Sequence, residues 1–214
     1  MNERHLYCFW TGANEMTPTR LRNLQLLKDH SDANVILVTP ETLGDYIVPG
    51  HPLHEAYPYL SAVHRADYLR VYFMHHIGGG YSDIKRPGGS WAKAFDDMDE
   101  HTWVNGYQEV HPDHIGYTPH CGLWQTLIGN GSFIFRPHTP LSEMFYNEVH
   151  MLLDAKLPEL KRHPATSPRD HAGSGSGYPI EWNEMLGRIF HRIQPMFLAH
   201  MKTSVPYPVC DDYQ

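Results

Sequence analysis

The sequence predicts an α/β fold in which helices flank a sheet that contains parallel strand pairs. Segments that favour strands and segments that favour helices alternate over the first 85 residues, in the order strand, helix, strand, short helix, long helix, strand. Such alternation is typical of sheets whose neighbouring strands run parallel. A chain of 214 residues is long enough for one substantial core, so we expect a single domain.

The first elements are marked by strong local signals. Residues 5–10 are mostly apolar and aromatic and predict a buried strand. Residues 34–38 are rich in β-branched side chains and predict a second strand. Thr17-Pro18 predicts a helix start, with an N-cap followed by proline at the first helical position. Its expected buried face consists of Leu21, Leu24 and Leu27. Thr39-Pro40 repeats the start signal before a short helix.

The segment from 62 to 85 predicts a helix, a glycine turn and a strand. Apolar residues recur at helical spacing from Ala62 to Ile77. Asp67 and Arg70 lie off that stripe and three residues apart, so they can pair, either as a solvated ion pair or facing a nucleotide. Gly78 to Gly80 are expected to end the helix. Alternation in the strand over 81–85 places Tyr81, Asp83 and Lys85 on one face.

The second half is less regular. Strands are predicted at 103–110 and 131–136, and Thr139-Pro140 starts a helix that Pro158 is expected to end. The glycine- and serine-rich stretch 162–179 predicts a loop, in which a mobile lid and a plain surface loop are both open. A last helix is predicted from about 180 to 193, then a strand at 196–199 and an irregular tail over 200–214.

Composition excludes several classes of protein. The formal charge of −7 argues against a nucleic-acid partner, and no apolar run is long enough to span a membrane. The N-terminus lacks the apolar core of a signal peptide, and three cysteines without a CxxC motif suit a reducing compartment, so we expect a cytoplasmic protein. A zinc site at His111, His114, His120 and Cys121 is disfavoured by their spacing. His64, His75 and His76 are expected on helix surfaces.

Two motifs carry a family resemblance. Asp67-Tyr68-Leu69-Arg70 and Gly78-Gly79-Gly80-Tyr81-Ser82-Asp83-Ile84 resemble the core of the GT-A glycosyltransferases with a DXD-type sugar-binding region, as in the capsular-polysaccharide and mannosyl-transfer families. The sequence departs from that pattern at Lys85, where the family has the second Asp. The chain is also similar in overall appearance to glycosyltransferases of large algal viruses, which would place it in the host cytoplasm.

The resemblance implies a GT-A (Rossmann-like) fold, with a mixed, mostly parallel sheet over residues 1–214, as a single domain or as the N-terminal part of a longer protein. It also implies transfer of a hexose or deoxyhexose from a nucleoside-diphosphate sugar, most often a UDP-sugar, to a glycan or glycoprotein acceptor. Mn²⁺ or Mg²⁺ would assist at Asp83. With Lys85 in the motif, three arrangements are open: Asp83 holds the metal, Lys85 itself contacts the diphosphate, or Asp83 simply pairs with Lys85 or Arg86. A catalytically inactive sugar- or nucleotide-binding module and a metal-dependent hydrolase are the alternative functions.

The site is expected beyond the carboxyl ends of the strands, where ligands bind in open α/β sheets. Thr11 and Asp83 both fall at such ends. Asp83 is the predicted leaving-group stabiliser and Glu181 the predicted base, with Glu184, Glu109 and Asp113 as alternatives. The resemblance and the local patterns give the residues expected to contact the donor: Trp10, Thr11, Gly12, Asp67, Arg70, Gly79, Tyr81, Ser82, Lys85, Asn130 and Ser132.

Overall fold

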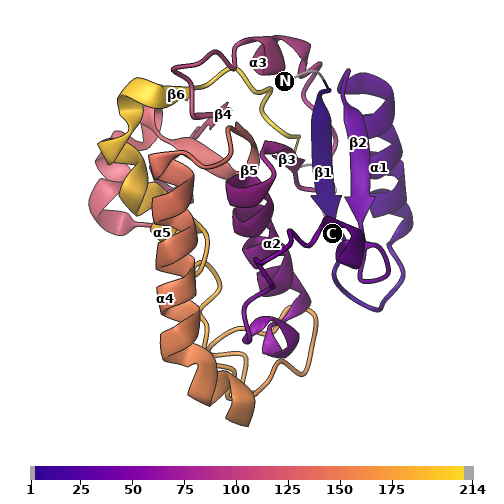
Figure 1. Cartoon of the computed structure of the whole chain (residues 1–214), viewed down its shortest axis with the longest axis vertical. Helices are drawn as coiled ribbons and strands as arrows, with labels where there is room; N and C mark the ends of the chain where they lie inside the picture. Colours follow the sequence, from indigo (N-terminus) through magenta and orange to yellow (C-terminus); the bar gives the residue numbers. More distant parts are fainter. Residues whose placement is uncertain (1–2, 210–214) are drawn as a thin grey trace.

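A computed structural model describes residues 3–209 as a six-stranded sheet flanked by helices (Figure 1). The strand order is β2-β1-β3-β5-β4-β6. β1 pairs in parallel with both β2 and β3, and β4 with β6, whereas β5 runs antiparallel to β3 and β4. The α/β fold with a mixed, mostly parallel sheet is therefore confirmed. The strands are β1 (His5–Phe9), β2 (Asn34–Val38), β3 (Gly79–Ser82), β4 (Val104–Gln108), β5 (Ile128–Phe135) and β6 (Met201–Lys202).

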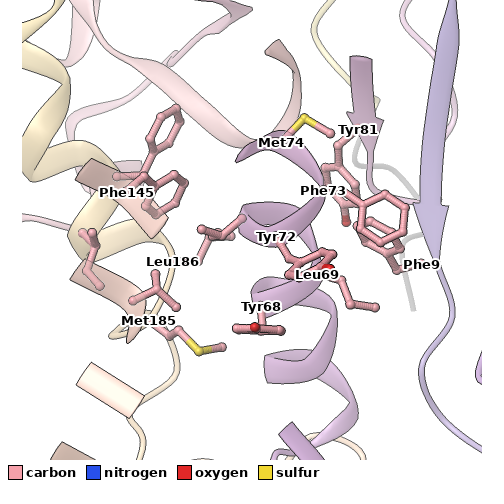
Figure 2. Packing of buried hydrophobic residues seen from close by; sticks show 14 of the residues in the cluster. Phe9, Tyr68, Leu69, Tyr72, Phe73, Met74, Tyr81, Phe145, Met185 and Leu186 are labelled. Atoms are coloured by element: carbon pink, nitrogen blue, oxygen red, sulfur yellow. The ribbon is translucent and has the colours of Figure 1, made fainter. Parts of the chain in front are cut away.

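Helices cover both faces of the sheet because apolar side chains point to both. The helices are α1 (Pro18–His30), α2 (Ala62–His76), α3 (Ala92–Asp96), α4 (Pro140–Arg162) and α5 (Gly187–Ile193). On one face, Tyr7, Phe9 and Tyr81 of the sheet pack with residues of α2, α4 and α5. Figure 2 shows Phe9 and Tyr81 beside Phe73 of α2. On the other face, Leu6 and Cys8 pack with residues of α1 and α3. The alternation along β1 thus divides the core into two layers.

The caps of α1 and α2 explain where these helices begin. The Thr17 and Ser61 hydroxyls accept hydrogen bonds from backbone N–H groups in the first turns of α1 and α2. Leu24 and Leu27 are buried as predicted, but Leu21 is exposed, so the prediction for that residue was wrong. After Thr39 the chain forms a 3₁₀ turn over Leu43–Tyr46 rather than a short α-helix.

α2 is buried on nearly every side because the sheet and α4 both pack against it (Figure 1). His64 and His76 are therefore buried, and the prediction that they lie on the helix surface was wrong. Asp67 and Arg70 do pair, but at a buried position rather than in solvent. α2 ends at His76, and Gly78 has a positive φ of 76°, so the glycine turn ends the helix as predicted. Gly79 and Gly80, however, already belong to β3.

Three boundaries in the second half differ from the prediction. α4 continues through Pro158 to Arg162: the proline is exposed near the end of the helix, and Leu160 beyond it is fully buried. The last helix, α5, begins only at Gly187, because residues 178–186 form turns and extended chain. The final strand lies at Met201–Lys202, since residues 194–200 form two 3₁₀ turns. Residues 210–214, the end of the predicted irregular tail, lie outside the described residues.

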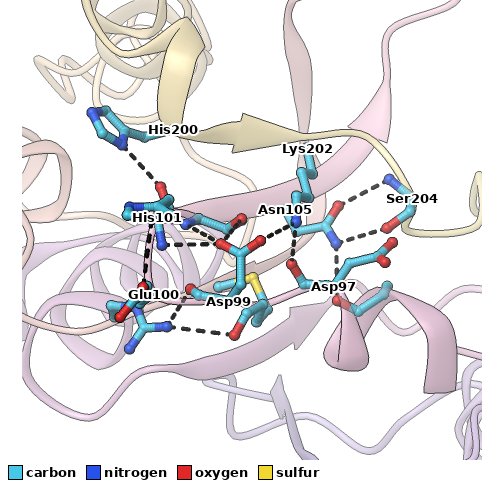
Figure 3. Close-up of polar contacts among 12 residues, drawn as sticks. Asp97, Asp99, Glu100, His101, Asn105, His200, Lys202 and Ser204 are labelled. Carbon is cyan, nitrogen blue, oxygen red and sulfur yellow. Dashed lines mark hydrogen bonds and ion pairs between the residues drawn. The ribbon is translucent and has the colours of Figure 1, made fainter.

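A polar network joins β4, β6 and the residue Ser204 after β6 to the segment around α3 (Figure 3). The Lys202 ammonium donates to the Asp97 carbonyl at 2.7 Å and lies 2.6 Å from an Asp99 carboxylate oxygen. The buried Asn105 amide donates to the Ala94 carbonyl at 2.9 Å and accepts from the backbone N–H of Ser204. Every described helix falls short of the length and apolar character that a membrane span requires.

Candidate functional site

A cleft of about 510 Å³ opens at the edge of the sheet where β1 and β3 end. The turn after β1 supplies Trp10, Thr11 and Gly12, and the segment after β3 supplies Asp83 and Lys85. β5 runs antiparallel to β3, so its first residues lie at the same edge. α2 forms one wall. The topology therefore brings strand ends, one strand start and a buried helix together around one space.

Nine of the predicted donor-contacting and catalytic residues line this cleft: Trp10, Thr11, Gly12, Asp67, Arg70, Tyr81, Asp83, Lys85 and Asn130. They come from α2, β3 and β5 and from the segments that follow β1 and β3. The Thr11 hydroxyl donates to the Ala62 carbonyl, which fixes the turn after β1 against the start of α2.

The other four predicted residues lie elsewhere. Gly79 is at the opposite end of β3, where it pairs with Phe135. Ser82 and Ser132 are buried in the sheet, with their hydroxyl oxygens 3.1 Å apart, and neither lines the cleft. Side chains alternate along the strand, so Ser82 points to the opposite face from Tyr81 and Asp83. Ser132 pairs with Ser82 and lies on that same face. Glu181 precedes α5 at an exposed position and pairs with Arg188, which lowers the pKa of its carboxyl and weakens it as a base.

Arg70 is the structural centre of the cleft. One guanidinium nitrogen lies 3.2 Å from an Asp67 oxygen and 3.1 Å from an Asp83 oxygen. The other donates to the Asn130 carbonyl at 3.0 Å, and the guanidinium lies over the Tyr81 ring at 4.5 Å. A planar group with a fixed fork of donors suits this arrangement, in which one side chain joins α2 to β3 and β5.

The two carboxylates of the cleft differ in their surroundings. Burial raises the pKa of Asp67, and the attraction of Arg70 opposes that effect without cancelling it. Burial also raises the pKa of Asp83, but Arg70, Lys85 and the Tyr81 hydroxyl together bring it below its ordinary value. The Tyr81 hydroxyl donates to Asp83 at 2.6 Å, and the Lys85 ammonium lies 3.1 Å from its second oxygen. Asp83 is therefore ionised at neutral pH.

Sequence reasoning missed three large side chains that line the cleft. Arg20 of α1 reaches across to donate to the Ile84 carbonyl at 3.1 Å. Arg169 and Trp182 come from the segment before α5, and the Arg169 guanidinium lies 5.5 Å from the centre of the Trp182 ring. No local pattern marks these residues, because their place depends on how α1 and the 163–186 segment pack on the sheet.

Basic side chains outnumber acidic ones among the described residues that line the cleft, although the formal charge of the protein is −7. Within residues 3–209 the lining includes the basic side chains Arg20, Arg70, Lys85 and Arg169 and the acidic side chains Asp67 and Asp83. Trp10 and Trp182 add flat aromatic surface. This part of the lining therefore suits an anionic ligand with a flat ring.

The surroundings of Asp83 do not fit the divalent cation predicted from the sequence. Mg²⁺ and Mn²⁺ take oxygen ligands, and no group of three or more His, Cys, Asp or Glu side chains among residues 3–209 is arranged to hold a metal ion. Each Asp83 oxygen already lies within ion-pair distance of Arg70 or Lys85, so a metal ion would share the carboxylate with a positive charge. The metal-ligand role of Asp83 thus stays a prediction, and the chemistry proposed for the site does not use it.

Glu109 is a further buried carboxylate at the same edge of the sheet, in addition to Asp67 and the largely buried Asp83. Glu109 directly follows β4, which runs in the same direction as β3. One Glu109 oxygen lies 3.3 Å from a ring nitrogen of the half-exposed His114. Burial raises the pKa of Glu109, although His114 opposes that shift. Among the alternatives to Glu181 as a base, Glu109 is thus a buried carboxyl with a raised pKa, but it does not line the cleft.

The glycine- and serine-rich loop is tied to one buried carboxylate. Asp170 accepts hydrogen bonds from the hydroxyls of Ser174 and Ser176 and from the backbone of Thr166. These bonds lower the pKa of Asp170, although its burial opposes them. The Pro168 carbonyl accepts from the backbone N–H of Val63 at 3.1 Å, so this part of the loop rests on the start of α2. The loop therefore borders the cleft with defined contacts, and its role as a mobile lid stays a prediction.

Comparisons with known proteins show where this fold occurs. No protein-family model and no curated protein matches the sequence. Among solved structures, the fold is similar to that of the PaToxG glycosyltransferase, with a TM-score of 0.54 and 10% sequence identity. The match covers 91% of this chain and 70% of that one. The chain thus has the fold of a known glycosyltransferase, at an identity that shows the fold alone.

Proposed function

We propose that the chain is a glycosyltransferase that moves a hexose or deoxyhexose from a nucleoside-diphosphate sugar, a UDP-sugar first among the candidates, to a glycan or glycoprotein acceptor. The observation that carries this proposal is the cleft at the carboxyl ends of β1 and β3, whose described lining brings Arg70, Lys85 and other basic side chains together with tryptophan rings. The diphosphate of such a donor is an anion that these basic side chains can bind, and its nucleotide base is a flat ring. The similarity of the fold to that of a glycosyltransferase supports the same conclusion.

Each group in the cleft has a role in this reaction. The bond between the anomeric carbon and the diphosphate breaks, and its electron pair stays on the departing oxygen. Arg70 and Lys85 are placed to stabilise that charge, since preorganised cations in a partly buried site act strongly on a leaving group. The acceptor hydroxyl oxygen forms the new bond to the anomeric carbon and gives its proton to a base. Trp10 offers a ring face to the nucleotide base.

The alternatives are separable by experiment. A binding module would hold the same donor without transfer, and Lys85 in place of a carboxylate keeps that alternative open. A metal-dependent hydrolase built on Asp83 and histidines has no supporting observation among residues 3–209, where Asp83 pairs with Arg70 and Lys85 and no group of histidines and carboxylates is arranged to hold a metal ion. The predicted Mn²⁺ or Mg²⁺ is tested by carrying out every assay with and without chelator.

A thermal-shift panel of UDP-, GDP- and dTDP-sugars tests the proposal. A ligand at one hundred times its Kd stabilises the folded state by about 2.7 kcal/mol. For a chain of this size we expect the Tm to rise by about 5–10 °C. Release of the nucleoside diphosphate during incubation with glycans then separates transferase from binding module. If no donor in the panel raises the Tm, the proposals of a transferase and of a binding module are both wrong.

A further inference from the structure

The Asp83 carboxylate is already neutralised by the protein. Its first oxygen accepts from the Tyr81 hydroxyl at 2.6 Å and lies 3.1 Å from the Arg70 guanidinium. Its second oxygen lies 3.1 Å from the Lys85 ammonium. The Asp83 and Lys85 side chains are only 11% and 14% exposed. The Arg70 and Lys85 cations therefore lie beside the oxygens of a largely buried carboxylate, in the place where a metal ion bound by those oxygens would lie.

The position of Lys85 follows from the backbone. Asp83 continues the pairing of β3 with β5, since its N–H donates to the Gly131 carbonyl at 2.8 Å. The Lys85 N–H then donates to the Asp83 carbonyl at 2.7 Å, which closes a tight turn. This turn brings the ammonium of residue 85 back onto the carboxylate of residue 83. A lysine here acts as a compact point charge with three donors, which suits phosphate oxygens.

A divalent cation at this position would have to approach the same carboxylate that Arg70 and Lys85 contact. Both of these side chains carry a positive charge, so each would repel the ion at short range. The contacts of Asp83 therefore favour a diphosphate held by these two cations over one held by a metal ion.

We propose that Lys85 and Arg70 take the place of a divalent cation, so that donor binding and transfer at this cleft need no metal. This inference rests on the proposed function. When the bond between the anomeric carbon and the diphosphate breaks, the departing diphosphate gains one negative charge. The Lys85 ammonium and the Arg70 guanidinium offset that charge. As the acceptor oxygen bonds to the anomeric carbon, its hydroxyl proton passes to an oxygen of the departing diphosphate. No oxidant, reductant or further co-reactant is required.

The test is a calorimetric titration of the full chain with UDP and UDP-glucose, and with GDP and dTDP in parallel, in the presence of EDTA and then of Mn²⁺. The wild-type Kd is expected to agree within about twofold between the two conditions. Lys85→Met is expected to weaken binding by about tenfold or more in both. Lys93→Met is the matched control, because Lys93 is exposed on α3 and outside the cleft, and its Kd should stay at the wild-type value.

The variant that best distinguishes metal-independent from metal-dependent binding is Lys85→Asp. This change removes the ammonium and supplies a second carboxylate beside Asp83, a donor set suited to Mg²⁺ or Mn²⁺. We expect this variant to lose nucleotide binding in EDTA and to regain it with Mn²⁺, which the wild type does not require. Thermal melts establish that each variant is folded, and Lys85→Gln, which also removes the charge, replaces Lys85→Met if that variant does not fold.

Each outcome has one meaning. A wild-type Kd that weakens by about tenfold in EDTA and recovers with Mn²⁺ overturns metal independence and leaves the proposed function in place. Wild-type binding that is equal in both conditions, but unchanged in Lys85→Met, overturns the role of Lys85. If no nucleotide binds in either condition, the proposed function itself is wrong and this inference falls with it.

Discussion

Replacement of Arg70 by methionine is expected to be among the most destabilising single changes in the cleft. Methionine keeps much of the aliphatic volume but leaves Asp67 and Asp83 without the guanidinium that lies between them. Asp83 retains Lys85 and the Tyr81 hydroxyl, whereas the Asp67 side chain is 7% exposed and loses the cation that pairs with it. Breaking a buried pair costs about 3–5 kcal/mol. We expect the free energy of unfolding to fall by about 4 kcal/mol at pH 7.

Urea denaturation at several pH values measures this loss. With an m value of about 2–3 kcal/mol/M, the midpoint should fall by about 1.5–2 M at pH 7. Without Arg70 the folded-state pKa of Asp67, already raised by burial, rises further above its unfolded value. The folded variant then takes up a proton that the unfolded chain does not, so its stability is regained as the pH falls from 7 towards 5.

Two further variants make the reasoning refutable. Asp67→Asn in the Arg70→Met background removes the charge of the Asp67 carboxylate and should recover a large part of the lost free energy of unfolding. Arg192→Met removes an arginine from an exposed pair with Glu148, which should cost about 0–1 kcal/mol. A loss below about 1 kcal/mol for Arg70→Met at pH 7, or a loss that does not shrink at lower pH, would show that Arg70 does not neutralise Asp67.

Three other changes test the fold. Gly78→Ala places a side chain at a φ of 76° with its Cβ 2.5 Å from a proline ring atom, so we expect thermal denaturation to show a loss of stability of about 1–3 kcal/mol. In the control Gly122→Ala, the new Cβ meets no atom within 4 Å, so stability should not change. Equal effects of the two variants would contradict the assigned backbone. Burial and neighbouring histidines lower the pKa of His76 to about 4, so the free energy of unfolding should fall as the pH drops from about 6.5 towards 4. Urea titrations of His76→Phe should show a weaker dependence of stability on pH. A pH dependence equal to that of the wild type would refute this prediction. Leu153→Ala in the core should cost about 2–5 kcal/mol, and Met151→Ala on the exposed face of the same helix under about 0.5; a smaller loss at 153 than at 151 would contradict the orientation of α4.

Local signals were sufficient for much of the fold. Thr17-Pro18 and Thr139-Pro140 predict the starts of α1 and α4 correctly because a cap and a proline act within one turn. The strand at 5–10 was recognisable because a buried parallel strand is a continuous apolar run. The strand at 34–38 was recognisable from its β-branched side chains, although it lies at the edge of the sheet and only Val38 in it is buried. The cleft could be placed because strand ends meet at one edge of the sheet, which brought Thr11 and Asp83 together as expected.

The errors have a common cause, which is packing that no local pattern encodes. The spacing of Asp67 and Arg70 predicts that they pair, but only the sheet and α4 on either side of α2 decide that the pair is buried. His64 and His76 were misplaced for the same reason. Arg20 and Arg169 could not be found because they reach the cleft from segments distant in sequence. Pro158 was read as a helix end, although α4 continues beyond it.

The central claim is that this cleft binds the diphosphate of a nucleotide-linked sugar through Lys85 and Arg70. A crystal structure of the chain grown with UDP tests it most directly. The account predicts phosphate oxygens within ion-pair distance of the Lys85 ammonium and the Arg70 guanidinium, at the carboxyl ends of β1 and β3. A nucleotide bound at another surface, or a diphosphate turned away from both cations, would contradict it.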